Sequence, residues 1–177
     1  CEFPAEGSVR SVVSFSPNWV PILYNDSVTL TCNLDTNPKK EKRYSWYRDN
    51  IRLSHYEKNY TIQAARPNDS GNYQCQADTT KKSDAVQLNF SVGPVILQAP
   101  PSVCEGDYLS LRCHSRYNDT EYSKFYKDGT VMESPGTGSI FQAGKAIKKM
   151  TGTYKCSKEY DQYSSTKFSN EEFIYVA

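Results

Sequence analysis

The sequence predicts an all-β protein that consists of two tandem β-sandwiches with a short linker. Three observations lead to this fold class. A cysteine-containing stretch, a tryptophan and a Tyr-x-Cys motif follow one another in the first half of the chain. The cysteines and the tyrosine of this set, at positions 32, 73 and 75, recur with one constant offset at 113, 154 and 156. Around both cysteine pairs, apolar residues alternate with polar ones, as in half-buried strands. The shared offset indicates two copies of one fold.

Residues 69–75, DSGNYQC, contain the most specific signal. The Asp-Ser-Gly turn opens into a strand on which Tyr73 and Cys75 share a face. A tyrosine two residues before a buried cysteine is the tyrosine corner of an immunoglobulin sandwich, where the hydroxyl hydrogen-bonds to the backbone upstream. This motif requires an earlier cysteine on an alternating strand and a large aromatic residue on the next strand. Cys32, which ends 28–32 (VTLTC), and Trp46 meet both requirements.

The second copy carries the same landmarks with two changes. Cys113 ends 109–113 (LSLRC), and the corner motif is 151–156 (TGTYKC). Phe125 takes the place of the tryptophan, and Met150 replaces the aspartate of the corner. The cysteines of each copy are equally far apart, and the spacing leaves no room for the extra strands of variable-type domains. We therefore expect two constant-like (C2-type) immunoglobulin sandwiches with core disulfides Cys32–Cys75 and Cys113–Cys156.

The expected organisation is an extended lead-in over residues 1–10, an immunoglobulin-like domain 1 over 11–93 and a domain 2 over 94–177. Gly93-Pro94 forms the whole linker, and a joint this short cannot act as a flexible tether. The two domains should therefore meet at a defined angle. Further strands are expected at 12–15, 19–24, 60–64, 86–92, 140–141 and 173–176. In 86–92, the side chains of Val86, Leu88, Phe90 and Val92 should point inward.

Bulk composition points to a secreted or extracellular chain. Six cysteines among 177 residues indicate an oxidising compartment, and only 37% of the residues are hydrophobic. Small domains with small hydrophobic cores need the additional stability that disulfides supply. The formal net charge of +1 favours neither nucleic acid nor an anionic membrane surface. No apolar run approaches the ~20 residues of a membrane helix. The chain starts without a basic segment and apolar stretch, so we expect a mature ectodomain fragment of a single-pass protein.

Catalytic and metal sites find little support. The chain has two histidines and no glycine-framed serine nucleophile. Residues 138–145 superficially suggest a phosphate loop, but the glycine spacing is one residue too long and Ala146 follows the lysine. His114 has no second metal-ligating residue at a useful spacing. We therefore predict no enzyme activity, no cofactor, no metal and no small-molecule substrate.

Five stretches carry a more specific resemblance, namely 26–32 (DSVTLTC), 69–76 (DSGNYQCQ), 83–88 (SDAVQL), 97–100 (LQAP) and 109–115 (LSLRCHS). Over both domains they resemble the ectodomains of leukocyte Fc receptors and Fc-receptor-like proteins. The resemblance implies two domains folded acutely against each other. It also implies that the linker and the linker-proximal loops of domain 2 grip an antibody Fc region.

The sequence departs from the antibody-binding members at two positions. Those members resemble one another in having a tryptophan just after the linker glycine and another three residues after the second-domain cysteine, and the pair clamps an Fc proline. Here Pro94 and Arg116 occupy these positions. The planar guanidinium of Arg116 can stack on a proline, and Tyr117 can supply an aromatic side chain.

The loops of domain 2 supply the candidate binding residues. Residues 157–165, SKEYDQYSS, have the composition of an antibody binding loop, in which tyrosine gives rigid amphipathic contact area. The loop after Cys113 lies at the same end of a sandwich. The alternative is that these residues form ordinary solvated turns. The predicted ligand-binding set is Pro94, Arg116, Tyr117, Tyr122, Lys158, Tyr160 and Tyr163.

Two further sets of residues suit an extracellular protein. Five Asn-x-Ser/Thr sequons favour a glycoprotein, and they lie at Asn25, Asn59, Asn68, Asn89 and Asn118. Cys1 and Cys104 remain after the core pairs are assigned. We expect them to form an interdomain disulfide, because free thiols are hazardous in secreted proteins and ten lead-in residues can span ~33 Å. The alternative is a Cys1 that is foreign to the natural chain and a lone thiol at Cys104.

The predicted function is that of a glycosylated cell-surface immune receptor that binds the Fc region of immunoglobulin. IgG is the antibody class expected. The alternative is an Fc-receptor-like immune receptor with a non-antibody protein ligand, such as an MHC-like molecule, or a homophilic adhesion module. We expect the protein to be attached to a membrane only through a segment outside this chain.

Overall fold

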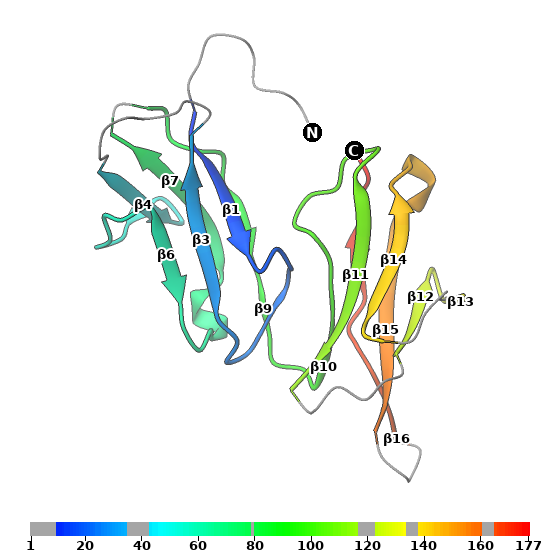
Figure 1. Ribbon diagram of the computed structural model, residues 1–177. Coiled ribbons are helices and arrows are strands. Elements are labelled where there is room, and N and C mark those ends of the chain that lie inside the picture. Colours follow the sequence, from blue (N-terminus) through cyan, green and yellow to red (C-terminus); the bar gives the residue numbers. More distant parts are fainter. Residues whose placement is uncertain (1–9, 35–42, 79, 117–122, 134–137, 161–164) are drawn as a thin grey trace. The chain divides into compact units, whose positions relative to one another are not determined.

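The computed structural model describes residues 10–34, 43–78, 80–116, 123–133, 138–160 and 165–177. The chain divides into two compact units, Glu2–Phe90 and Ser91–Ala177, which we call domain 1 and domain 2. Each domain is built from antiparallel β-sheets (Figure 1). The division falls three residues before the expected boundary between Gly93 and Pro94.

Domain 1 contains two sheets and a short ribbon. The first sheet has the order β1 (Val12–Ser16), β3 (Val28–Asn33), β6 (Asn59–Ile62). The second has the order β5 (Ile51–Arg52), β4 (Tyr44–Arg48), β7 (Gly71–Ala77), β8 (Val86–Leu88). The ribbon pairs β2 (Ile22–Leu23) with β9 (Phe90–Ser91). Three strands lie between the cysteine strands β3 and β7, as in a constant-like sandwich.

Domain 2 repeats this arrangement. One sheet has the order β10 (Val95–Gln98), β11 (Tyr108–Ser115), β14 (Ile140–Lys145). The other has the order β13 (Thr130–Met132), β12 (Ser123–Lys127), β15 (Gly152–Tyr160), β16 (Ser165–Phe168). The final strand, β17 (Glu172–Ile174), also pairs with β15. The prediction of two all-β, C2-type immunoglobulin sandwiches is therefore confirmed.

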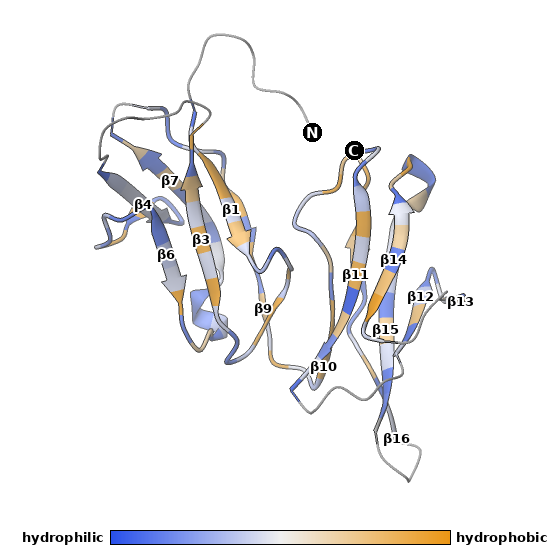
Figure 2. Ribbon diagram, in the orientation of Figure 1, coloured by the Kyte–Doolittle hydropathy of each residue, from blue (hydrophilic) through white to orange (hydrophobic). Residues whose placement is uncertain are grey.

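Each domain has its own core, closed by a disulfide between its two sheets. Cys32 on β3 bonds Cys75 on β7, and Cys113 on β11 bonds Cys156 on β15, each across 43 residues of sequence. Trp46 is fully buried opposite Cys75. The strands carry apolar residues throughout both domains (Figure 2). They turn these residues toward the disulfides because side chains alternate between the two faces of a strand.

Phe125 of β12 takes the tryptophan's place opposite Cys156. Its ring packs 5.5 Å from the ring of Phe141 on the other sheet, measured between centroids. Domain 1 has the equivalent pair of rings, Trp46 and Tyr60, with centroids 6.0 Å apart.

Both domains have the predicted tyrosine corner. A 3₁₀ helix precedes each corner, η1 (Pro67–Asp69) in domain 1 and η2 (Lys148–Met150) in domain 2. The hydroxyl of Tyr73 donates to the carbonyl oxygen of Asp69, and that of Tyr154 donates to the carbonyl oxygen of Met150. Burial raises the pKa of Tyr73 to about 12, and burial also raises the pKa of Tyr154. Both phenols therefore stay protonated as hydrogen-bond donors.

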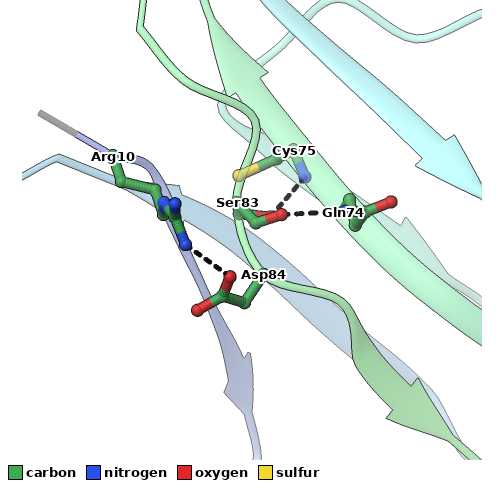
Figure 3. Close-up of polar contacts among 5 residues, drawn as sticks. All are labelled: Arg10, Gln74, Cys75, Ser83 and Asp84. Carbon is green, nitrogen blue, oxygen red and sulfur yellow. Dashed lines mark hydrogen bonds and ion pairs between the residues drawn. The ribbon is translucent and has the colours of Figure 1, made fainter. Parts of the chain in front are cut away.

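A second repeated device was not expected from the sequence. The hydroxyl of buried Ser83 accepts a hydrogen bond from the backbone N–H of Cys75 at 2.9 Å (Figure 3). Ser169 does the same for Cys156, also at 2.9 Å. In each case the serine N–H donates to the same cysteine's carbonyl oxygen. In Cys75 and Cys156, the backbone N–H and carbonyl groups are therefore both satisfied by one serine.

The start of the described chain is tied to the same region of domain 1. Arg10 forms an ion pair with Asp84 at 2.6 Å, next to Ser83 (Figure 3). Arg10 also makes an isolated parallel bridge with Lys81, and Ser11 is buried. Position 10 belongs to the segment that was expected to be an extended lead-in. These contacts bind it to residues 81 and 84, which precede β8.

Three strand expectations were only partly correct. The segment 19–24 forms a strand only at β2. In 86–92, Leu88 is buried, but Val92 is 58% exposed. The chain changes partners there, because β8 pairs with β7 whereas β9 pairs with β2. The alternation seen in the sequence therefore ends before Val92, whose predicted inward orientation is wrong. The last strand is β17, which ends at Ile174, two residues earlier than expected.

Candidate functional site

One end of domain 2 brings together the segments that were predicted to bind a ligand. Val95 at the start of β10 pairs with Ser115 at the end of β11. Ser123 at the start of β12 pairs with Lys158 near the end of β15. The end of β11, the start of β10 and the β15–β16 hairpin therefore meet at one end of the sandwich (Figure 1). We call this the linker-proximal end.

Arg116 and Pro94 are both exposed at this end. The guanidinium Nη2 of Arg116 donates to the backbone carbonyl oxygen of Val92. This contact joins the residue after β11 to the segment before β10, inside domain 2. The arginine therefore fixes the linker segment.

Lys158 differs from its prediction as an exposed binding residue. Its side chain is 0% exposed, and its Nζ donates to the Ser139 hydroxyl at 2.9 Å. Lys158 lies on the inner face because it is in phase with Tyr154 and Cys156 on β15. The alternation is visible in the sequence, but the charge of Lys158 suggests a loop residue and not an inward position on a strand. The structure places Lys158 inside the sandwich, away from a ligand.

The segment 157–165 was predicted to be a loop and is largely a β-hairpin. β15 extends to Tyr160, which pairs with Ser165 on β16, and Glu159 pairs with Thr166. Tyr160 thus sits at the last position of a strand. Tyr117, Tyr122 and Tyr163 lie outside the described residues.

A partly exposed aromatic cluster on the same sheet was not predicted. The rings of Tyr126 and Phe168 lie 5.9 Å apart, and the Lys155 Nζ lies 5.4 Å and 5.2 Å from their centroids. All three point away from the disulfide, because Lys155 is out of phase with Cys156. The sequence alone does not show this cluster, since it depends on the register between β12, β15 and β16.

The side chains at this end are suited to binding a protein partner. Among the described residues, no group of three or more His, Cys, Asp or Glu side chains could hold a metal ion. The linker-proximal end instead combines a planar cation, an exposed proline and a β-hairpin. Such elements suit recognition of a protein surface.

Comparisons with known proteins agree with this fold. The family described as "Immunoglobulin domain" matches residues 11–78. The chain is 36% identical over 149 residues to "Low affinity immunoglobulin gamma Fc region receptor III-A" of Felis catus, covering 83% of the chain and 59% of that protein. It is 35% identical over 177 residues to "Fc receptor-like protein 5" of Mus musculus, covering 97% of the chain and 29% of that protein. The chain belongs to the Fc receptor and Fc receptor-like family.

Among solved structures, the three N-terminal domains of the bacteriophage RB49 Highly Immunogenic Outer Capsid protein match with a TM-score of 0.44 and 15% identity. That match covers 96% of the chain and 59% of the capsid protein chain.

This Fc receptor homologue spans less than two thirds of the first curated relatives that it matches, 59% of the feline receptor and 29% of the mouse Fc receptor-like protein. The family consists of receptors with immunoglobulin domains and is not enzymatic. In the part of the chain that the structure describes, no helix is long and apolar enough to span a membrane.

Four of the five predicted glycosylation sites of the receptor homologue lie in the described residues, and all four are exposed: Asn25, Asn59, Asn68 and Asn89. The fifth, Asn118, lies outside them. The Asn59 carboxamide oxygen accepts a hydrogen bond from the Thr31 hydroxyl at 2.9 Å. A glycan requires an exposed asparagine, and these four sites meet that requirement. Glycosylation at all five sequons stays a prediction.

Cys104 is disulfide-bonded. Its predicted partner, Cys1, lies outside the described residues, so the pairing of these two cysteines also stays a prediction.

Proposed function

We propose that this chain is the extracellular ligand-binding portion of a leukocyte cell-surface receptor that binds the Fc region of immunoglobulin. The observation that carries the proposal is the 36% identity to a protein named as an immunoglobulin gamma Fc region receptor. IgG is therefore the first antibody class to test. Because the chain covers 59% of that relative, its partner is inferred from the family.

We place the Fc contact at the linker-proximal end of domain 2. The proposed contact residues are Pro94, Arg116, Tyr117, Tyr122, Tyr160 and Tyr163. Lys158 is excluded because it is buried. The strand register supports this choice, since it brings the start of β10, the end of β11 and the hairpin to one end.

Arg116 is the central residue of the proposed contact. Its hydrogen bond to the Val92 carbonyl holds the guanidinium beside the linker before any ligand arrives. A guanidinium plane that is already fixed loses less conformational entropy when it stacks on a proline or an aromatic ring. Tyrosines around it would add rigid contact area at low entropic cost.

A binding experiment with the glycosylated chain tests the proposal. The chain is immobilised and exposed to Fc fragments of each antibody class of the host. We expect saturable binding to an IgG Fc fragment. Replacing an interface hot spot costs about 2 kcal/mol or more, so Tyr160→Ala and Arg116→Ala should each weaken binding by roughly 30-fold.

Matched variants separate contact from folding. Arg116→Lys keeps a donor for the Val92 carbonyl but removes the planar face, so it should weaken binding almost as much as Arg116→Ala. Tyr108→Ala should leave binding unchanged, since Tyr108 is 75% exposed at the opposite end of β11. Equal losses for Tyr108→Ala and Tyr160→Ala would contradict the proposed site.

A second candidate function is an Fc-receptor-like immune receptor with a non-antibody protein ligand, such as an MHC-like molecule, or an adhesion module. It is favoured by Pro94 and Arg116, which stand where antibody-binding members resemble one another in having tryptophans. It is also favoured by the alignment to Fc receptor-like protein 5, which covers 97% of the chain. Absence of binding to every Fc class at micromolar concentration, with the disulfides intact, would select this alternative.

A further inference from the structure

Domain 1 has a polar cavity that the Fc contact does not involve. It has a volume of about 450 Å³ and is lined by Arg43, Tyr44, Ser45, Arg52, Tyr56 and Asp78. These residues come from the start of β4, from β5 and its following loop, and from the residue after β7. All of them belong to domain 1. Known ligand pockets have volumes of about 300–1,000 Å³, so the space suits a small chemical group.

Two guanidinium groups bracket one tyrosine ring in this cavity. The Cζ of Arg43 lies 5.6 Å from the centroid of the Tyr56 ring, and that of Arg52 lies 5.7 Å from it. Arg52 also donates to the Ser45 hydroxyl at 3.3 Å. The Tyr56 side chain remains 50% exposed. The ring therefore holds two positive charges at the cavity and still offers open aromatic surface.

Both arginines contribute a positive charge to the lining of the cavity. Within the residues that the structure describes, neither Arg43 nor Arg52 takes part in an ion pair. Asp78 lines the same cavity, but its carboxylate accepts a hydrogen bond from the backbone N–H of Arg43 at 3.1 Å. An anion that enters would therefore gain charge-assisted hydrogen bonds without breaking an ion pair among the described residues.

We propose that this cavity binds the carboxylate-bearing terminal sugar of a glycan. The two guanidiniums match a carboxylate, which they can engage through paired N–H donors. The exposed face of Tyr56 can pack against the apolar face of a sugar ring. Ser45 and Asp78 supply a hydroxyl and a carboxylate for the hydroxyl and amide groups of the sugar.

The mixed lining favours an acidic sugar over other anions. A phosphate or sulfate would engage the guanidiniums but leave the Tyr56 face and the Asp78 carboxylate without partners. A peptide carboxylate would use the guanidiniums but leave the aromatic face and Asp78 without partners. An acidic sugar brings one carboxylate, several hydroxyls and an apolar ring face together, as this lining requires.

The test uses the α-methyl glycoside of N-acetylneuraminic acid as the probe and NMR titration of the whole chain as the measurement. The chain's own glycans are trimmed enzymatically beforehand, so that they do not compete. We expect saturable chemical-shift changes at millimolar probe, centred on Ser45, Arg52 and Tyr56. The methyl ester of the same sugar should bind at least tenfold more weakly, because it has lost the charge that the arginines recognise.

Variants locate the site. Arg52→Gln and Arg43→Gln should each weaken probe binding about tenfold or more. Tyr56→Phe should retain binding and Tyr56→Ala should lose it, since only the ring face is needed. Lys58→Gln removes one positive charge from an exposed position outside the cavity and should change the affinity less than twofold.

Three results would overturn the proposal. They are equal binding of the ester and the acid, equal losses in Lys58→Gln and Arg52→Gln, and binding of an acetylated Asp-containing tripeptide as tight as that of the sugar. Each arginine variant must keep the melting temperature of the parent chain. If one variant unfolds, the comparison between the acid and its ester on the parent chain still decides the question.

Discussion

At the scale of single residues, the two tyrosine corners show which positions can vary. The acceptor for Tyr73 is a backbone carbonyl, as is the acceptor for Tyr154. Met150 can therefore replace Asp69 without loss of the bond. What the replacement removes is a separate contact, in which the Asp69 carboxylate accepts from the Arg66 N–H at 2.9 Å. The sequence predicted both corners because their geometry depends on the tyrosine–cysteine spacing alone.

Tyr73→Phe should lower the free energy of unfolding by about 1–3 kcal/mol at neutral pH, because a buried carbonyl loses its donor. The pKa of Tyr73 is about 12 in the folded state, against about 10 when unfolded. The unfolded state therefore releases this proton first, and stability falls as pH rises from 10 towards 12. Urea unfolding across this range should show a smaller fall for the phenylalanine variant. An unchanged pH dependence would contradict the assignment.

Ser83 and Ser169 are the residues that sequence reasoning missed, although one of them follows each Tyr-x-Cys motif. A serine is usually exposed, and nothing in its local pattern shows that it faces a cysteine N–H. The signal available was that a serine recurs in the strand region after each Tyr-x-Cys motif. Reading it requires the register between neighbouring strands, which the sequence alone does not supply.

Ser169→Ala should destabilise domain 2 by about 1–3 kcal/mol, because the buried N–H of Cys156 loses its acceptor. Ser102→Ala, at an exposed position of the same domain, is the matched control and should change stability by less than about 0.5 kcal/mol. Thermal unfolding with the disulfides oxidised measures both. A loss no larger than that of the control would show that the hydrogen bond contributes nothing.

At the scale of strands, the hairpin β15–β16 explains why composition misled the prediction. Tyrosine, serine and lysine are common in binding loops, but tyrosine is also a good strand former. Strand assignment of β15 here depends on pairing with β16 and with β12, which comes from elsewhere in the sequence. Lys158 lies inside because side chains alternate between the two faces of a strand, whatever the residue type.

Lys158→Ala should lower the free energy of unfolding by roughly 2–4 kcal/mol, since it leaves a cavity beside the disulfide and removes the Ser139 contact. Lys158→Met keeps most of the volume and should lose less. Both folded variants should bind the Fc region as the parent chain does, because the side chain is buried. Surface plasmon resonance of the methionine variant checks this, and a tenfold loss of affinity would restore Lys158 to the interface.

At the scale of the whole molecule, the two domains share their framework and differ at their edges. In both, an aspartate after the aromatic strand accepts from a backbone N–H of the corner strand at 2.9 Å, Asp49 from Asn72 and Asp128 from Thr153. The glycine before each of these N–H groups leaves room for the carboxylate, because a Cβ at Gly71 would lie 2.9 Å from Asp49 Oδ2. These shared contacts follow from the fold, because they recur at matching positions of the two corners.

The remaining question at this scale is which cysteine Cys104 bonds. Within the described chain no cysteine is free, and Cys104 is disulfide-bonded. Each core disulfide joins two strands of one domain, so neither constrains the other domain. A Cys1–Cys104 bond would instead tie the start of the chain to domain 2. It would thereby limit how far the two domains can separate around the proposed Fc contact.

Non-reducing peptide mapping should recover one linked pair that contains positions 1 and 104. Cys104→Ser should then leave Cys1 reactive toward a maleimide, which adds the mass of one label, while the parent chain takes none. Solution scattering of the variant should show a broader distribution of sizes, because the covalent link between the lead-in and domain 2 is gone. If Cys104 is instead recovered as a mixed disulfide with glutathione or another chain, no disulfide links the lead-in to domain 2. The Gly93-Pro94 linker and the Arg116–Val92 contact would then be left to hold the Fc-binding surface in place.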